Sequence, residues 1–182
     1  MNLSIVWAAA ALGVVTALCA ARPALAQAPG PALPLIGGPS AITAGVFAAS
    51  SGDARDRGGS TQIAAEFRYT LPVPNPFVVP TRTVLSLGVQ TGARGGSHST
   101  TIPITVAQLF GEGGRSPNAA NTFFGGGGVG VYILNQSSLS TATRLGIFPE
   151  VGYNITDRVF VDAKYQFVSH AEGLNILAGL RF

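Results

Sequence analysis

From residue 40 onward, the chain alternates apolar and polar residues in segments separated by clusters of Gly, Asn, Asp, Ser and Pro. Successive side chains of a β-strand point to opposite faces, so this period of two predicts strands rather than helices. Strands of about ten residues with turn residues between them are typical of a transmembrane barrel. The predicted fold is therefore all-β, an eight-stranded antiparallel up-and-down transmembrane β-barrel. The eight segments are 41–50, 60–71, 81–91, 100–110, 121–134, 143–154, 158–168 and 173–182.

Each predicted strand has one apolar face and one face that carries polar groups and charges. In a small barrel the charges meet across the lumen and must pair, because an unpaired buried charge is very costly. The sequence therefore predicts a lumen charge network of five basic and three acidic residues. Its members are Glu66, Arg68, Arg82, Arg144, Glu150, Asp162, Lys164 and Arg181. The alternative is that these charges face solvent on an ordinary half-buried sheet, which alternates in the same way.

Aromatic residues near the ends of the even-numbered segments favour a membrane location. These segments all run back toward the side where the first segment begins. Four aromatics at one level are predicted to form the interfacial girdle of a membrane barrel. The girdle consists of Tyr69, Phe110, Tyr153 and Phe182, each on the apolar face of its segment.

The connections between the segments differ in length and character. The polar, Gly-rich loops 51–59 and 92–99 are expected on the outer side, as the surfaces that would contact an extracellular ligand. The inner connections 72–80 and 111–120 are longer than usual periplasmic turns. Pro149 lies within a segment and cannot donate a ladder hydrogen bond, so a bulge or local break is predicted there.

The N-terminus predicts export from the cytoplasm. Residues 3–21 form an apolar run, and Ala24-Leu25-Ala26 places small residues where a signal peptidase reads them. We predict a cleaved signal peptide over 1–26, a Pro/Gly-rich linker over 27–39 and the barrel over 40–182. An uncleaved membrane anchor is the competing interpretation, because the run approaches the roughly 20 residues that a spanning helix needs.

The C-terminal part of the chain resembles a known family. The pair of segments around Asn154-Ile155-Thr156-Asp157, and the ending Ala178-Gly179-Leu180-Arg181-Phe182, are similar to the OmpA/OmpX/OmpW-like small outer-membrane β-barrel superfamily. The resemblance implies a bacterial outer-membrane location, contact with outer-membrane lipid and insertion by the barrel-assembly machinery, which reads the terminal strand. It identifies no ligand.

No catalytic, cofactor or metal site is predicted. The only cysteine, Cys19, lies in the predicted signal peptide, so no disulfide or cysteine-ligated metal is expected in the mature chain. The glycine run 125–128 lacks the Lys-Ser/Thr of a phosphate loop, and its glycines are interpreted as room for larger lumen side chains. The net charge is +3 with dispersed arginines, which gives no nucleic-acid patch. His98 and His170 are interpreted as exposed loop residues.

These features predict a non-enzymatic barrel with a structural, adhesion or small apolar solute role. Eight strands leave an interior just wide enough for side chains, so a filled lumen is expected rather than a general porin. Two alternatives stay open. One is a lipid A-modifying barrel enzyme, which needs His98 or His170 beside a serine near the outer rim. The other is a soluble periplasmic β-barrel that binds an apolar ligand.

Overall fold

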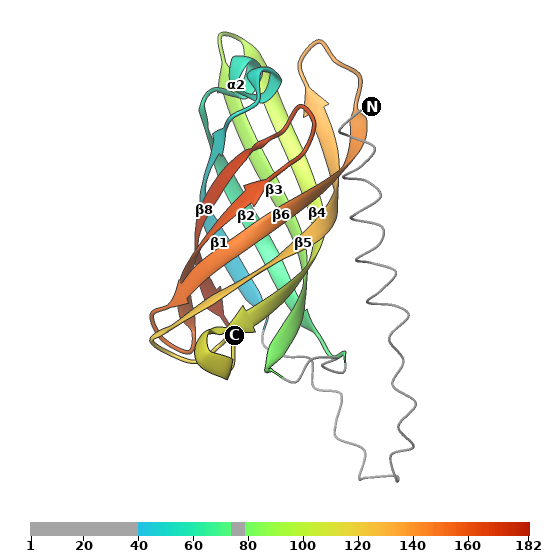
Figure 1. Cartoon of the computed structure of the whole chain (residues 1–182). Coiled ribbons are helices and arrows are strands. Elements are labelled where there is room, and N and C mark those ends of the chain that lie inside the picture. Colours follow the sequence, from blue (N-terminus) through green and yellow to red (C-terminus); the bar gives the residue numbers. More distant parts are fainter. Residues whose placement is uncertain (1–39, 74–78) are drawn as a thin grey trace, which may run out of the picture. The chain divides into compact units, whose positions relative to one another are not determined.

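A computed structural model describes residues 40–73 and 79–182. The predicted signal peptide 1–26, the linker 27–39 and residues 74–78 lie outside the described residues. Eight antiparallel strands follow one another around a closed barrel, and β1 pairs with β8 (Figure 1). They are β1 (Ala41–Ala49), β2 (Thr61–Leu71), β3 (Thr81–Arg94), β4 (Ser97–Gly111), β5 (Thr122–Gln136), β6 (Ala142–Asn154), β7 (Val159–Gln166) and β8 (Gly173–Arg181). The predicted fold class is confirmed, and each strand overlaps its predicted segment.

The up-and-down order gives the barrel two distinct ends. The β1–β2, β3–β4, β5–β6 and β7–β8 connections lie at one end, here called the α2 end after its helix α2 (Gly52–Gly58). The other end carries the start of β1 beside the end of β8, where the Phe182 backbone N–H donates to the Ser40 carbonyl at 2.9 Å. We call it the Phe182 end.

The predictions that residues 51–59 and 92–99 form loops at the α2 end are wrong. Residues 51–59 contain α2, which has Asp53 in its first turn and is followed by the C-cap Gly59, whose φ is +85°. The expected loop 92–99 shrinks to a two-residue turn, because β3 runs to Arg94 and β4 begins at Ser97. Gly95 and Gly96 have φ values of +58° and +82°, as a tight hairpin turn with two left-handed residues requires.

Pro149 causes a break in one ladder and no bulge. Pairing of β6 with β5 is continuous and includes Gly127↔Pro149. Pairing of β6 with β7 stops at Glu150↔Lys164 and resumes at the isolated bridge Ile147↔Phe167 in the same register. The missing N–H therefore interrupts hydrogen bonding without adding a residue.

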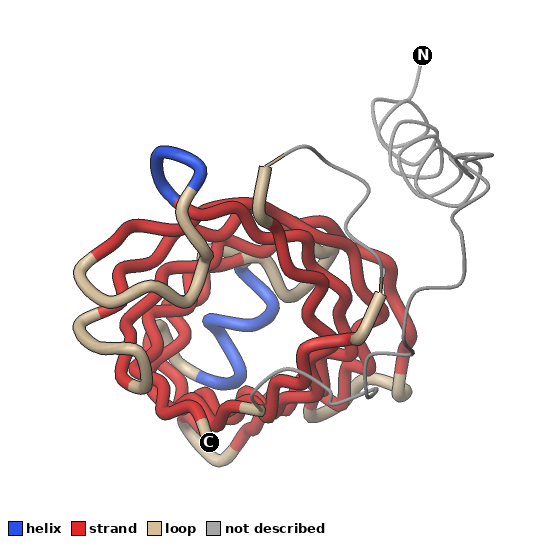
Figure 2. The backbone as a smooth tube through the Cα atoms, turned by 90° about the horizontal axis from the view of Figure 1, so that it is seen from below, coloured by secondary structure: helices blue, strands red, loops and turns tan. Residues whose placement is uncertain are grey.

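The two faces of the wall differ as the alternation predicts. Outward side chains of β8 are exposed and apolar, with Ile176 at 51% and Leu180 at 54% of full exposure, and Phe182, which follows β8, is at 66%. Inward side chains such as Asn175 and Arg181 are buried. Along the barrel axis, α2 lies across the opening at its own end (Figure 2).

Candidate functional site

The centre of the barrel holds a buried ionic cluster, which we define as Glu66, Arg68, Glu150, Asp162 and Lys164. Strands β2, β6 and β7 contribute these residues, and each side chain is at most 5% exposed. The Arg68 guanidinium lies 2.8 Å from Glu150 Oε1, 2.9 Å from Asp162 Oδ2 and 3.2 Å from Glu66 Oε2. Lys164 Nζ pairs with Glu66 Oε1. The contacts cross the lumen from β2 to β6 and β7.

Two further predicted members, Arg82 and Arg181, lie nearer the Phe182 end and bond to neutral groups. Arg181 donates to Asn154 Oδ1 at 2.6 Å, and its guanidinium lies 4.3 Å from the centre of the Phe160 ring. Arg82 donates to Asn118 Oδ1. Among the described residues, neither arginine has a carboxylate within ion-pairing distance.

Arg144, the eighth predicted member, is not in the network. It is exposed at the α2 end, and its guanidinium donates to the Thr143 carbonyl at 3.1 Å. Its strand β6 extends beyond β7, whose last bridge to β6 is Ile147↔Phe167. The inward face of β6 at Arg144 therefore has no β7 wall beside it and opens to solvent.

Inward aromatic rings also occupy the lumen, which the sequence prediction of an ionic interior missed. Each ring packs on a glycine of a neighbouring strand, because a Cβ there would approach a ring carbon within 2.2–2.7 Å. The pairs are Phe124 on Gly152, Phe148 on Gly128, Phe160 on Gly179 and Phe47 on Gly173. Three of the four are direct cross-strand pairs. The sequence did contain a sign of these inward rings, because each of the four phenylalanines alternates in phase with the polar residues of its strand. Gly128 belongs to the glycine run, which therefore makes room as predicted.

A layer of amides lies between the ionic cluster and the α2 end. Gln90 Nε2 donates to Gln166 Oε1 at 2.8 Å and to Asn175 Oδ1 at 3.1 Å. Gln166 Nε2 donates in turn to the Ala171 carbonyl at 2.6 Å. These three amides are fully buried. They satisfy one another, as buried polar groups must.

Helix α2 covers the opening above this layer. Ala54 is buried in a cluster with Phe47 and Leu177. Arg57 Nη1 donates to the Ser137 carbonyl in the β5–β6 connection at 3.1 Å. Asp53 pairs with His170 Nδ1 in the β7–β8 connection, and this hydrogen bond holds the pKa of the Asp53 carboxyl below its ordinary value. Three separate connections are therefore joined into one surface.

The four predicted girdle residues all point outward near the Phe182 end. Tyr69, Phe110 and Tyr153 are partly exposed, and Phe182 is exposed. The Tyr153 ring packs against Phe123, with ring centroids 4.8 Å apart.

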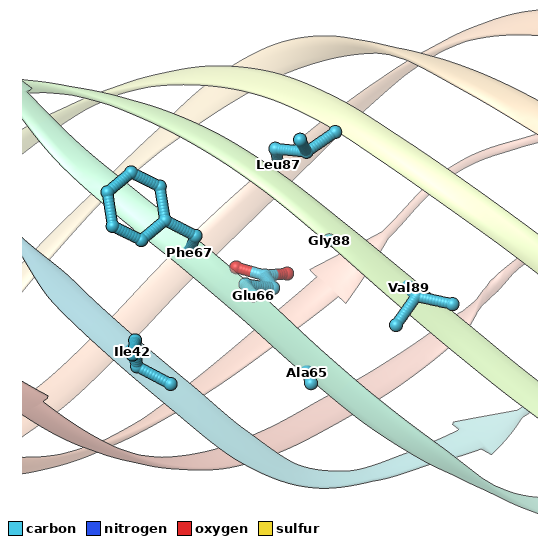
Figure 3. A pocket seen from close by; sticks show the side chains of 7 residues that line it. All are labelled: Ile42, Ala65, Glu66, Phe67, Leu87, Gly88 and Val89. Atoms are coloured by element: carbon cyan, nitrogen blue, oxygen red, sulfur yellow. The ribbon is translucent and has the colours of Figure 1, made fainter.

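A shallow groove of about 390 Å³ lies on the exterior of β1, β2 and β3 (Figure 3). Ile42, Phe67, Leu87 and Val89 stand around it. The Glu66 side chain lies behind the wall, where Arg68 and Lys164 hold its carboxylate. The walls of the groove are therefore apolar.

Comparison with known proteins gives one distant structural likeness and assigns no family to the chain. No protein-family model matches the chain, and no curated protein matches it. Among solved structures, the backbone structure of the Yersinia pestis outer membrane protein Ail in a phospholipid bilayer nanodisc is 16% identical, covering 80% of this chain and 99% of that chain, with a TM-score of 0.44. A likeness at this level assigns neither a family nor a function.

The two histidines are exposed, but each has a partner at the α2 end. His98 Nδ1 lies 2.8 Å from Ser137 Oγ, which also accepts the His98 backbone N–H at 2.8 Å. His170 pairs with Asp53. Within 40–73 and 79–182, no carboxylate lies within ion-pairing distance of His98, and no three residues form a metal-ligand group. No helix in the same ranges is long and apolar enough to cross a membrane.

Proposed function

We propose that the mature chain is a non-enzymatic outer-membrane β-barrel whose lumen is closed to solutes and whose α2 end is a folded surface outside the cell. The ionic cluster carries this proposal. Its contacts join opposite walls, and each of its charges is buried with a partner. Moving any of them aside would leave an uncompensated charge, which is strongly unfavourable. A lumen filled in this way does not pass sugars.

The exterior supports residence in lipid. Apolar side chains are exposed on every strand, from Ile42 on β1 to Leu180 on β8, and Leu145 reaches 79% of full exposure. Soluble monomers rarely expose continuous apolar surface of this extent. This exterior argues against the soluble periplasmic barrel, whose apolar side chains would have to point inward. The outward aromatics near the Phe182 end match the girdle of a membrane barrel.

Liposome swelling tests the closed lumen. Purified mature protein is reconstituted into liposomes and challenged with a small sugar, with a general porin as positive control and protein-free liposomes as negative control. We expect the rate of the protein-free liposomes. Swelling at a rate near that of the porin would overturn the proposal.

The orientation can be tested on whole cells, because the mature chain lacks cysteine. Arg94→Cys places a thiol at the exposed end of β3 at the α2 end, and Asp157→Cys places one at the Phe182 end. A membrane-impermeant maleimide should label the first variant on intact cells and the second only after lysis. The reverse pattern would contradict an external α2 end.

The contacts at the α2 end favour a surface-binding or structural role. Arg57 and Asp53 tie α2 to the β5–β6 and β7–β8 connections, so the surface is held in one shape. A fixed surface binds without the entropic cost of ordering loops. Insertion is proposed to proceed through the barrel-assembly machinery acting on β8.

One observation favours a second candidate, a lipid-modifying hydrolase. Ser137 Oγ and His98 Nδ1 are at hydrogen-bond distance at the α2 end, as a serine nucleophile and its base would be. Mass spectrometry of lipid A from cells that express the wild-type chain, Ser137→Ala or His98→Ala decides between the candidates. The non-enzymatic proposal expects the same lipid A in all three. Modification by the wild-type chain alone would replace it with the hydrolase.

A further inference from the structure

A pocket of about 200 Å³ opens at the α2 end, away from the ionic cluster. It lies between the β5–β6 hairpin and the β7–β8 connection, where β6 extends past the end of β7. The residues that line it are Leu134, Gln136, Leu139, Ser140, Ala142, Arg144 and His170. Because β7 does not reach the level of Arg144, this side chain is not part of the charge network and lines the pocket instead.

The lining combines apolar walls with cationic and neutral polar groups. Leu134, Leu139 and Ala142 are the apolar members, and no aspartate or glutamate lines the pocket. The hydrogen bond to the Thr143 carbonyl occupies one nitrogen of Arg144, and within the described ranges no carboxylate is in ion-pairing distance of it. The remaining donors of a planar guanidinium match a carboxylate in a bidentate arrangement.

Two residues that line the pocket are hydrogen-bonded to each other. Gln136 Nε2 donates to the His170 carbonyl at 3.1 Å, which links β5 to the β7–β8 connection. Ser138 and His170 both have positive φ, 66° and 69°, which is uncommon for residues other than glycine. Residues held in such conformations cluster at ligand clamps. The two connections that form the pocket each contain one.

We propose that this pocket binds a small organic anion, with its carboxylate on Arg144 and its apolar part against Leu134 and Leu139. A dry cavity of about 150 Å³ is known to hold a benzene ring, so 200 Å³ suits a ring with one carboxylate. Asp53, the carboxylate that pairs with the lining residue His170, forms no ion pair with Arg144, so the guanidinium is left to the ligand. The class of ligand is therefore an aromatic or short aliphatic monocarboxylate.

Fluorine NMR with 4-fluorobenzoate tests the proposal on the mature chain in nanodiscs. We expect its signal to broaden with the protein and not with empty nanodiscs, and 4-fluorobenzamide, which has no charge, to stay sharp. Arg144→Met should weaken binding by about tenfold or more, because a charged hydrogen-bonded pair is lost. The matched control is Arg94→Met, an exposed arginine on the β3–β4 hairpin at the same end, which should bind like the wild type.

Several results would overturn the proposal. The first is an unbroadened 4-fluorobenzoate signal with the wild-type chain, and the second is equal binding of 4-fluorobenzamide. The third is equal weakening of binding by Arg94→Met and Arg144→Met, which would mean that the ligand is attracted by surface charge alone. Arg144 is exposed, so its variant should fold, and the mobility of the unboiled protein on a detergent gel checks this. Leu139→Ser provides a second variant, which should weaken binding while Arg144 is intact. Sugar permeability, which tests the closed lumen, is independent of all these outcomes.

Discussion

Replacing Arg68 with methionine removes a cation that contacts three buried carboxylates. The five groups of the ionic cluster carry two positive and three negative charges, a sum of −1. Without Arg68 the sum is −2. Lys164 still pairs with Glu66, whereas Glu150 and Asp162 lose the one ion-pair partner that each has among the described residues. Methionine fills similar space, so the loss is one of charge compensation.

Breaking a buried ion pair typically costs about 3–5 kcal/mol, because it leaves an uncompensated buried charge. We therefore expect Arg68→Met to lower the free energy of unfolding by about 3–5 kcal/mol. With a urea dependence of about 2 kcal/mol per molar, the unfolding midpoint falls by roughly 2 M. Arg144→Met is the matched control, and a surface change of this kind stays within about 0.5 kcal/mol.

The assay must avoid tryptophan fluorescence, because Trp7 is the only tryptophan and lies in the predicted signal peptide. Protein folded into lipid vesicles is equilibrated in urea, and the fraction that keeps the mobility of the folded, unboiled form is measured on a detergent gel. If Arg68→Met and Arg144→Met unfold at the same urea concentration, the charge pairing in the ionic cluster does not stabilise the barrel.

Three further predictions follow from single contacts. Gly152→Ala would bring a Cβ within 2.2 Å of Phe124 Cζ, so overpacking should destabilise the fold by about 1–3 kcal/mol in the same urea assay; unchanged stability would show that the ring moves freely. Leu87→Arg puts a charge on the exterior and should cost about 2–4 kcal/mol in lipid near the bilayer midplane; a smaller cost than in detergent would contradict lipid contact. The pKa of Asp53 is lower in the folded state than in the unfolded chain. The bond from Asp53 to His170 therefore stabilises α2 fully at any pH above the ordinary pKa of an aspartate, and this stabilisation is lost as the pH falls through the lowered pKa. Hydrogen exchange of the α2 amides should therefore be steady from neutral pH down to about pH 5 after correction for intrinsic rates, and protection should fall only in stronger acid; loss of protection already at pH 6 would contradict this.

The strands and their two faces followed from local pattern alone. A period of two fixes which side chains share a face, and the closed barrel then decides that the face with Glu66 and Lys164 is the inner one. Arg144 alternates in phase with these inward residues, but the alternation along β6 does not show how far the neighbouring strand β7 extends. Its exposure depends on β7 ending at Gln166, which is a property of the assembled wall.

Helix α2 and the inward aromatics depend on contacts between distant residues. Seven residues are too few for a helical period to appear, and α2 is held by packing of Ala54 on the barrel and by the bond from Arg57 to Ser137. Phe124 and Phe160 lie on the polar parity, and only strand register reveals that each faces a glycine. Register was not readable from one sequence.

The most direct test of the account is the side-chain environment along β8 in a lipid bilayer. Cys19, the only cysteine, lies in the predicted signal peptide, so a chain that begins at Gln27 allows single cysteines at successive positions from Leu174 to Ala178, each carrying a spin label, in reconstituted vesicles. Accessibility to oxygen, which dissolves in lipid, should be high at positions 174, 176 and 178 and low at positions 175 and 177. Uniform accessibility, or maxima at the odd-numbered positions, would contradict a barrel with a lipid-facing exterior and a filled lumen.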